Sequence, residues 1–259
     1  YALYIAGEEG KVEAHISGGT YTSASKVAVL CGNDNTGGDG GINAKATAYI
    51  TGGTFIGGGT NKQALQAGKN TGDPQITGGT FSSNVSAYVP DGLNVIDNQD
   101  GTFTVARLDS VYLDGQNGDD GNSGADADNA VKTLDKALQL VAEDGVIYIC
   151  GTVTIEKNTE RTLENVIFKR AEDFDGNMDR LFAVNGTLNL SNVTIDGNNI
   201  VLDTDNYGTS YSSLIVLFQG AILNIGDGTR LINNSGASAI EVYDESAVLN
   251  MTGGEISGN

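Results

Sequence analysis

The sequence has few or none of several residue types on which common functional sites depend. It has no tryptophan, two prolines, two cysteines and one histidine among 259 residues. Two cysteines cannot supply the disulfide framework of a small secreted fold, and a Ser-His-Asp, Cys-His or histidine-metal site would have to use His15. The sequence contains no G-x-S-x-G nucleophile motif. We therefore expect His15 to lie on the surface, and Cys31 and Cys150 to be buried without a disulfide.

Long apolar runs and positive charge are also scarce. No run of about 18 apolar residues occurs, so a membrane-spanning helix is not expected. The chain has 14 Lys and Arg against 33 Asp and Glu, a formal net charge of −19. Residues 1–107 contain 6 basic and 9 acidic residues, net −3, whereas residues 108–259 contain 8 and 24, net −16. Such an acidic surface repels nucleic acid, so we expect no nucleic-acid partner, and it attracts divalent cations.

Glycine, by contrast, is abundant, and part of it lies in one repeated phrase. "ITGGTF" occupies residues 50–55 and 76–81, "ISGGTY" residues 16–21 and "MTGGEI" residues 251–256. The copies share an apolar residue before the glycine pair and another after it: Ile16, Ile50, Ile76 and Met251, then Tyr21, Phe55, Phe81 and Ile256. Because glycine reaches positive φ without a Cβ clash, the phrase predicts a sharp corner between two strands.

A second repeated phrase precedes the corners. "ALYIAG", "AVLCG", "ALQAG" and "AIEVYD" alternate in period two, and align in columns of Leu3, Val29, Leu65 and Ile240, then Ile5, Cys31, Ala67 and Val242. Alternation inside a repeat of 34 and then 26 residues is typical of a solenoid. We predict an all-β fold, a right-handed parallel β-helix whose equivalent side chains stack from coil to coil. In the second half Asn189, Asn224 and Asn250 align, which predicts a ladder of side-chain amides.

Interruptions in the repeat predict two tandem coils. Residues 93–105 have the pattern of a β-hairpin, which we expect to cap residues 1–107, the C-terminal part of a first β-helix. Residues 108–259 begin with a strand, an Asp/Gly-rich loop and one short capping helix, with Thr133 as its N-cap, Leu138 in its apolar stripe and Gly145 just after its end. The first rungs of a second β-helix follow, truncated in mid-rung, so we expect further rungs, or end-to-end stacking, to cover the open edge.

The start of the second coil resembles a known superfamily. The stretches "YLDGQNGDDGN", "TLDKALQL" and "GVIYICGTVTI" resemble the N-terminal cap of pectate-lyase-like β-helix proteins. The "ITGGTF" rungs resemble those of large, repeat-rich cell-surface proteins (adhesins) of Gram-positive bacteria. The resemblance implies an extracellular protein of the cell surface or cell wall. It does not select an activity, because this superfamily includes lyases, glycosidases, phage tailspikes and non-catalytic adhesins.

The Asp/Gly-rich loop is one candidate site. Asp114, Asn117 and Asp119, with Asp120 and Asn122 close by, place oxygen ligands among glycines at short spacing, as calcium sites do. The loop sequence lacks the spacing and the terminal glutamate of an EF-hand. Asx turns explain the same residues without a metal. Calcium and a purely structural loop therefore both stand as interpretations.

Carboxylates in the second half form another candidate site. A glycosidase places two acids across the scissile bond, and Asp203, Asp205 and Glu241 are the catalytic candidates. We expect Glu241 to point outward from a strand. Tyr207 and Tyr211 lie in the same long loop as the two aspartates, and are candidates for contact with a sugar or a protein partner.

Two functions of different classes follow. The first is a structural and adhesive segment of a large bacterial cell-surface protein, a rigid stalk whose loops contact a host surface or a glycan. The second is an extracellular glycosidase or polysaccharide lyase of the β-helix superfamily. The sequence lacks tryptophan and shows no compact acid–base constellation or column of basic residues. We therefore favour the structural function, with calcium as the one cofactor to consider.

Overall fold

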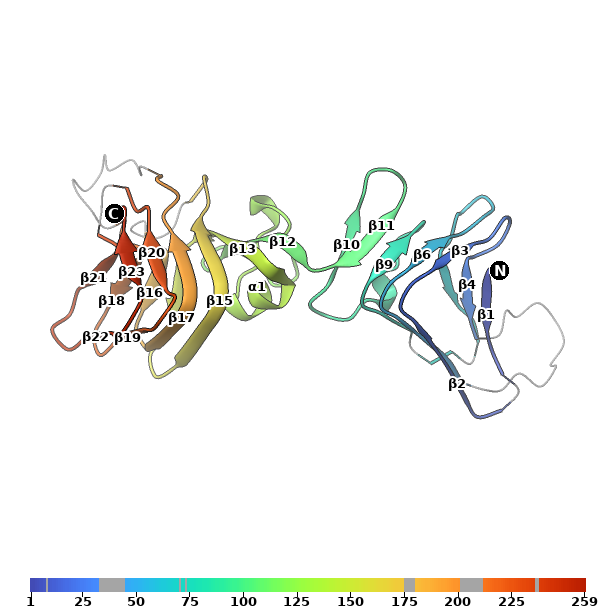
Figure 1. The fold of residues 1–259 in the computed structure, drawn as a ribbon, viewed down its shortest axis with the longest axis horizontal. Coiled ribbons are helices and arrows are strands. Elements are labelled where there is room, and N and C mark those ends of the chain that lie inside the picture. The colour runs from blue at the N-terminus through green and yellow to red at the C-terminus, as the bar shows by residue number, and fades with distance from the viewer. Residues whose placement is uncertain are drawn as a thin grey trace. The chain divides into compact units, whose positions relative to one another are not determined.

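A computed structural model describes residues 1–7, 9–32, 45–69, 71–72, 74–174, 180–200, 212–235 and 238–259. The chain is an all-β protein with parallel sheets, and α1 (Leu134–Leu140) is the one α-helix in this described part (Figure 1). It divides into two compact units, Tyr1–Arg107 and Leu108–Asn259. Each unit has its own sheets and is described by itself.

In the first unit, three short strands in succession form a rung, and each strand of a rung joins a different sheet. The sheets β1-β4-β7, β2-β5-β8 and β3-β6-β9 are parallel throughout. The strands are β1 (Leu3–Ile5), β2 (Lys11–Ile16), β3 (Thr20–Thr22), β4 (Val29–Cys31), β5 (Lys45–Ile50), β6 (Thr54–Ile56), β7 (Leu65–Ala67), β8 (Gln75–Ile76) and β9 (Gly79–Phe81).

The predicted side-chain columns of this unit are confirmed. Ile16 is in register with Ile50, and Ile50 with Ile76; their exposed fractions are 7%, 0% and 0%. Adjacent strands lie about 4.8 Å apart, so aromatic rings one rung apart can stack. The rings of Tyr21, Phe55 and Phe81 do so, with centroids 4.9 and 5.0 Å apart. The repeated apolar residues therefore form a continuous core in the first unit.

The glycine pairs form the corners for two separate physical reasons. Gly19, Gly53 and Gly79 have φ values of 93°, 111° and 115°, in the left-handed region that favours glycine. The corners also stack closely: a Cβ on Gly53 would lie 3.0 Å from the Gly19 carbonyl oxygen, and one on Gly79 would lie 3.0 Å from that of Gly53. Conformation and rung-to-rung contact thus both disfavour a larger residue at Gly53 and Gly79.

An antiparallel hairpin ends the parallel ladder of this unit. After the 3-10 helix Ser86–Tyr88, β10 (Asn94–Asp97) and β11 (Phe103–Ala106) pair antiparallel, and β11 also pairs antiparallel with β9. The turn between the two strands uses Gln99 and Gly101 at positive φ. Reversal of strand direction at β11 stops the addition of further parallel rungs on that sheet.

The second unit contains two parallel sheets. The larger has the order β12-β13-β15-β17-β19-β22, with β20 pairing β17 and β23, and the smaller has the order β14-β16-β18-β21. The elements are β12 (Leu108–Asp114), the 3-10 helix Ala127–Asn129, α1, β13 (Val141–Gly151), β14 (Val153–Ile155), β15 (Glu160–Arg170), β16 (Phe182–Val184), β17 (Thr187–Asp196), β18 (Ile215–Leu217), β19 (Ile222–Ile225), β20 (Arg230–Ile232), β21 (Ile240–Val242), β22 (Val248–Met251) and β23 (Glu255–Ser257).

The predicted asparagine ladder runs along the outer side of the larger sheet. Asn224 Nδ2 donates to Asn189 Oδ1 at 2.7 Å, and Asn250 Nδ2 donates to Asn224 Oδ1 at 2.8 Å. Asn189 Nδ2 in turn donates to Glu160 Oε1 at 2.8 Å. An amide is both donor and acceptor, so one side chain per rung can continue the chain of hydrogen bonds.

The helix differs from its prediction at the C-terminal end. Thr133 is the N-cap as predicted, its Oγ1 accepting from the Lys136 N–H at 3.2 Å. The helix ends at Leu140, however, and Gly145 lies inside β13, so Gly145 as the residue after the helix is wrong. Val141 instead pairs with Leu108 and is buried. A β-branched residue with a strand partner favours the extended conformation over another helical turn.

The buried face of the helix also differs from the predicted stripe. Leu134, Ala137 and Leu140 are buried, whereas Leu138 is half-buried. The spacing of three residues between these positions places them on one face of the short helix. This face packs against β12 and β13, where the larger sheet begins.

The predicted columns do not extend from the first unit to the second. Ile240 and Val242 stack on Ile215 and Leu217 in the smaller sheet of the second unit. Met251 is in register with Ile225. Met251 and Ile256 are 44% and 43% exposed, because they belong to the outermost rung of the described strands. Similar repeated sequences thus form similar rungs in each of the two units, and each unit has its own columns.

The aromatic column gives a test of the core. Phe55→Ala should lower the free energy of unfolding by about 3–5 kcal/mol, since it removes a fully buried ring between two others. Urea unfolding followed by far-UV circular dichroism measures this change. Phe103→Ala is the control, because Phe103 is only half-buried and should cost less. Equal losses for the two variants would contradict the stacked core.

The ladder gives a second test. Asn224→Ala removes the acceptor of Asn250 and the donor to Asn189, and it should lower the free energy of unfolding by about 1 kcal/mol. The same urea titration measures it. Ser191→Ala, at an exposed position on β17, should change stability less. No difference between the two variants would show that water replaces the ladder without cost.

Candidate functional site

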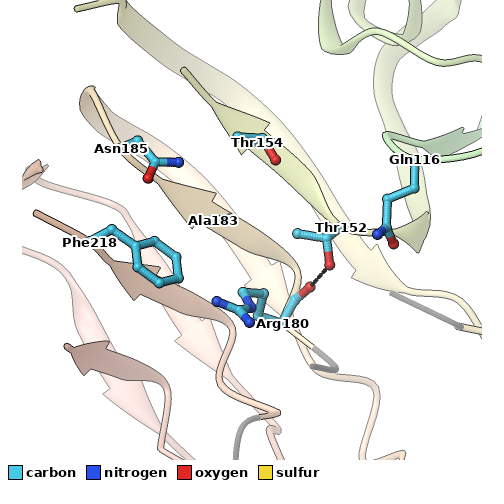
Figure 2. Close-up of a pocket in the computed structure, with 7 residues that line it drawn as sticks. All are labelled: Gln116, Thr152, Thr154, Arg180, Ala183, Asn185 and Phe218. Carbon is cyan, nitrogen blue, oxygen red and sulfur yellow. Dashed lines mark hydrogen bonds between the residues drawn. The ribbon is translucent and has the colours of Figure 1, made fainter. Parts of the chain in front are cut away.

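The outer face of the smaller sheet carries a hollow of about 250 Å³. Thr154 and Ala183 are in register and lie between inward residues with exposed fractions of 4% or less, so both belong to the outer face. Figure 2 shows the residues around the hollow, which come from several consecutive turns of the chain. They are Gln116, Thr152, Thr154, Arg180, Ala183, Asn185 and Phe218.

Arg180 provides a buried cation in the wall of this hollow. Its exposed fraction is 7%, and its guanidinium carbon lies 5.1 Å from the centroid of the Phe218 ring. Its backbone carbonyl accepts a hydrogen bond of 2.8 Å from Thr152 Oγ1 (Figure 2). Burial lowers the pKa of Arg180, while the charges of Glu241 and Tyr243 act in the opposite direction. An arginine stays protonated in proteins, so the hollow has a positive wall in an acidic unit.

The lining of the hollow offers polar groups and an aromatic ring. None of the described lining residues is an acid, a histidine or a cysteine. The amides of Gln116 and Asn185 and the hydroxyl of Thr154 offer hydrogen bonds, and Phe218 adds an aromatic ring. Polar groups around an aromatic surface are typical of sites for polar organic ligands.

A second hollow of about 380 Å³ shares Asn185 with the first. Its lining is almost wholly polar and comes from the connections between the two sheets and from the first residues of β15 and β17. It consists of Lys157, Asn158, Thr159, Glu160, Asn185, Gly186, Thr187, Gln219 and Gly220. Together the two hollows extend over successive connections of the second unit.

Glu241 is the catalytic candidate that the structure describes. It is half-buried on β21, in register with Val216, which is itself in register with Ala183. Glu241 therefore belongs to the same outer column as the hollow. Asp203, Asp205, Tyr207 and Tyr211 lie outside the described residues.

The Asp/Gly-rich loop is held by Asx turns. Asp114 Oδ1 accepts from the backbone N–H groups of Gln116 and Asn117, both at 2.9 Å. Asp119 Oδ1 accepts from the Gly121 N–H at 2.8 Å. The described ranges hold no group of three or more His, Cys, Asp or Glu side chains that could hold a metal ion. A calcium site at Asp114, Asn117 and Asp119 stays a prediction.

Asp120 has a different role in this loop. Its Oδ1 accepts from the N–H groups of Lys132 and Thr133 at 2.9 and 2.8 Å, and its Oδ2 accepts from Thr133 Oγ1 at 2.8 Å. Desolvation acts to raise the pKa of Asp120, but these hydrogen bonds outweigh it and hold the pKa below its ordinary value. The carboxylate thus fixes the loop to the start of α1.

His15 lies on the surface, and the two cysteines are buried. His15 is exposed as predicted, and its ring stacks on Tyr49 with centroids 4.8 Å apart. Cys31 and Cys150 are buried free thiols, as expected. Burial raises the pKa of the Cys31 thiol against an opposing hydrogen bond with Thr71. A thiol with a raised pKa is a poor nucleophile at neutral pH.

No motif in the sequence indicates what surrounds the two buried arginines, Arg170 and Arg180. Arg170 is fully buried, and its Nη2 donates to the Ser212 carbonyl at 3.0 Å and to Asn234 Oδ1 at 3.1 Å. These acceptors lie 42 and 64 residues away along the chain. In the sequence both arginines belong to a scattered set of basic residues. Their contacts follow only once the rungs are placed above one another.

Comparisons with protein-family models, curated proteins and solved structures find no match to this chain. Of the helices in the described residues, none has the length and apolar character needed to cross a membrane.

The pKa of Asp120 gives a pH test. A carboxylate whose pKa is lowered in the folded state contributes stability at pH values above the pKa of an aspartate in the unfolded chain, which is about 4. This contribution is lost as pH falls through the folded-state pKa. Asp120→Asn should therefore lower stability at pH 7 and flatten the decline of stability in acid. Urea midpoints between pH 7 and pH 2 measure this, with Asp109→Asn, at an exposed position on β12, as control. Parallel pH profiles for wild type and Asp120→Asn would contradict the assignment.

Proposed function

We propose that this chain is a structural and adhesive segment of a large bacterial cell-surface protein. In this proposal, each unit is a right-handed parallel β-helix, the two follow one another in tandem, and the segment acts as a rigid extracellular stalk. The observation that carries the proposal is the register of equivalent side chains over successive rungs in both units. It agrees with the resemblance of the repeated phrases to those of Gram-positive adhesins.

Stiffness is the physical property that such a role needs. Each strand of a middle rung is hydrogen-bonded to the rungs on both sides, and the aromatic and amide columns add contacts in the same direction. Bending a stack would open these contacts on one side in many rungs at once. Parallel rungs that contact only their neighbours are typical of extended solenoids.

The hollows on the second unit are the proposed contact surface. Their amides and hydroxyls can hydrogen-bond to a sugar, and Phe218 can contact its apolar face. The unit as a whole has a net charge of −16. This charge favours a neutral glycan over an acidic polysaccharide, which the surrounding carboxylates would repel.

The alternative function is an extracellular glycosidase or lyase that acts on a polysaccharide. The specific observation in its favour is the position of Glu241, a half-buried carboxylate on the outer column of the hollow. A glycosidase would need a second acid at a distance that fits a sugar bond. Asp203 and Asp205 are the candidates for that second acid.

Binding and turnover, measured together, separate these functions. The chain is applied to an array of neutral and acidic glycans, and the same glycans are assayed for new reducing ends and unsaturated products. We expect binding without turnover, and a loss of affinity of about tenfold for Phe218→Ala, which removes the aromatic contact. His15→Ala, in the first unit, should bind as the wild type does.

Two results would contradict this function. Turnover that disappears in Glu241→Gln would establish the enzyme instead. Failure to bind any glycan, with Phe218→Ala and wild type indistinguishable, would remove the hollow as a glycan contact.

A further inference from the structure

The floor of the hollow of about 250 Å³ is Ala183, whose side chain is a single methyl group. In the outer column of the smaller sheet, Thr154 lies one rung before Ala183 and Val216 lies one rung after it. The strand position therefore accepts a β-branched side chain. A valine in place of Ala183 would, however, extend two further methyl groups into the hollow, so the small residue is what leaves the space open.

Polar side chains lie on two sides of this floor. Asn185 follows Ala183 by two residues, just after the end of β16, and Thr154 is on the neighbouring strand. Neither side chain makes a hydrogen bond with the described residues. Thr154 is exposed and Asn185 is half-buried, so both can bond to a ligand. On another side Arg180 contributes a guanidinium, which carries five N–H donors (Figure 2).

An aromatic ring completes the lining. The Phe218 N–H donates to the Val184 carbonyl, as the Asn185 N–H donates to the Ile155 carbonyl, both at 2.9 Å. Phe218 thus has the position of Asn185 one rung further along. Its ring and the methyl group of the floor are two apolar surfaces among hydrogen-bonding groups. The hollow therefore offers donors, acceptors and apolar contact within a small space.

The charges around the hollow favour a neutral acceptor over an anion. Arg180 is 7% exposed, and the negative charge of Glu241 acts on it. The cation is therefore partly balanced within the chain, and the unit around it has a net charge of −16. An amide carbonyl is a strong acceptor that carries no net charge, because its dipole is large. It can bond to Arg180 without being repelled by the surrounding carboxylates.

We propose that the hollow recognises the acetamido group of an N-acetylated sugar. This inference rests on the proposed glycan contact and names the class of sugar. Arg180 donates to the acetamido carbonyl oxygen, and the side-chain oxygen of Asn185 accepts from the acetamido N–H. The acetamido methyl group packs on Ala183 beside the Phe218 ring.

The sizes of the two hollows agree with this assignment. About 250 Å³ is below the range of about 300–1,000 Å³ typical of pockets for whole drug-sized ligands, so the first hollow takes one sugar residue. The second hollow, of about 380 Å³, shares Asn185 and can take the next residue of the glycan. A sugar with a hydroxyl in place of the acetamido group would leave the Arg180 donors and the methyl floor without a partner, and such sites discriminate by lost hydrogen bonds.

Two matched trisaccharides test the proposal. Chitotriose and cellotriose have the same linkage and differ only in the acetamido group that replaces one hydroxyl of each sugar. Isothermal titration calorimetry of the whole chain should give about tenfold or more tighter binding of chitotriose, since the acetamido group adds hydrogen bonds and an apolar contact. In saturation-transfer NMR, the acetamido methyl protons should receive more saturation than the ring protons.

A variant of the floor tests where the group binds. Ala183→Val should weaken the binding of chitotriose by about tenfold and bring it close to that of cellotriose, because the added methyl groups occupy the space of the acetamido group. Val216 shows that the same column holds valine one rung further along. Ala125→Val is the matched control, which adds the same two methyl groups at an exposed position outside both hollows. It should bind both trisaccharides as the wild type does.

Three results would overturn the proposal. These are equal affinities for chitotriose and cellotriose, a preference for chitotriose that is unchanged in Ala183→Val, and saturation that falls on the ring protons and spares the methyl groups. Glycan binding as such is read on the glycan array. Equal affinities would therefore remove the acetamido assignment and keep the glycan contact, whereas an array without any bound glycan would remove both.

Discussion

The structure depends on register between successive rungs. Each strand must place its inward side chains directly over those of the strand before it, about 4.8 Å away. A slip of one residue would exchange the inward and outward sets, putting Tyr49 where Ile50 lies in the first unit. The aromatic column lies on the inner side of a sheet in the first unit, and the asparagine ladder lies on the outer side of a sheet in the second. Each follows the register of its own strands.

Much of this register could be predicted from the sequence, because two features of each repeat indicate it. The glycine pair marks the corner, and the alternation before it marks which residues point inward. The columns of Ile16, Ile50 and Ile76 and of the three asparagines follow from alignment alone. The hairpin of β10 and β11 could also be predicted, since two alternating runs flank a turn sequence.

Other features could not be predicted, because competing long-range interactions decide them. The end of α1 is set by the pairing of Val141 with Leu108, which no local helix signal contains. The two stacks remain separate although their phrases match, so alignment alone assigned Ile240 to the wrong column. The candidate site is the least predictable part. Arg180 and Phe218 are 38 positions apart in sequence, and only the stacking of connections brings their side chains together.

The asparagine ladder has a direction, and this has an evolutionary consequence. Every amide donates toward the earlier rung, and the series ends on the carboxylate of Glu160. A gene segment that encodes one whole rung can be duplicated or deleted without breaking the series, because each copy brings one donor and one acceptor. A partial rung would leave an amide facing an unrelated side chain. Unequal recombination in whole rungs is therefore the genetic change that this architecture tolerates best, and the length of the stack can vary while its cross-section is conserved.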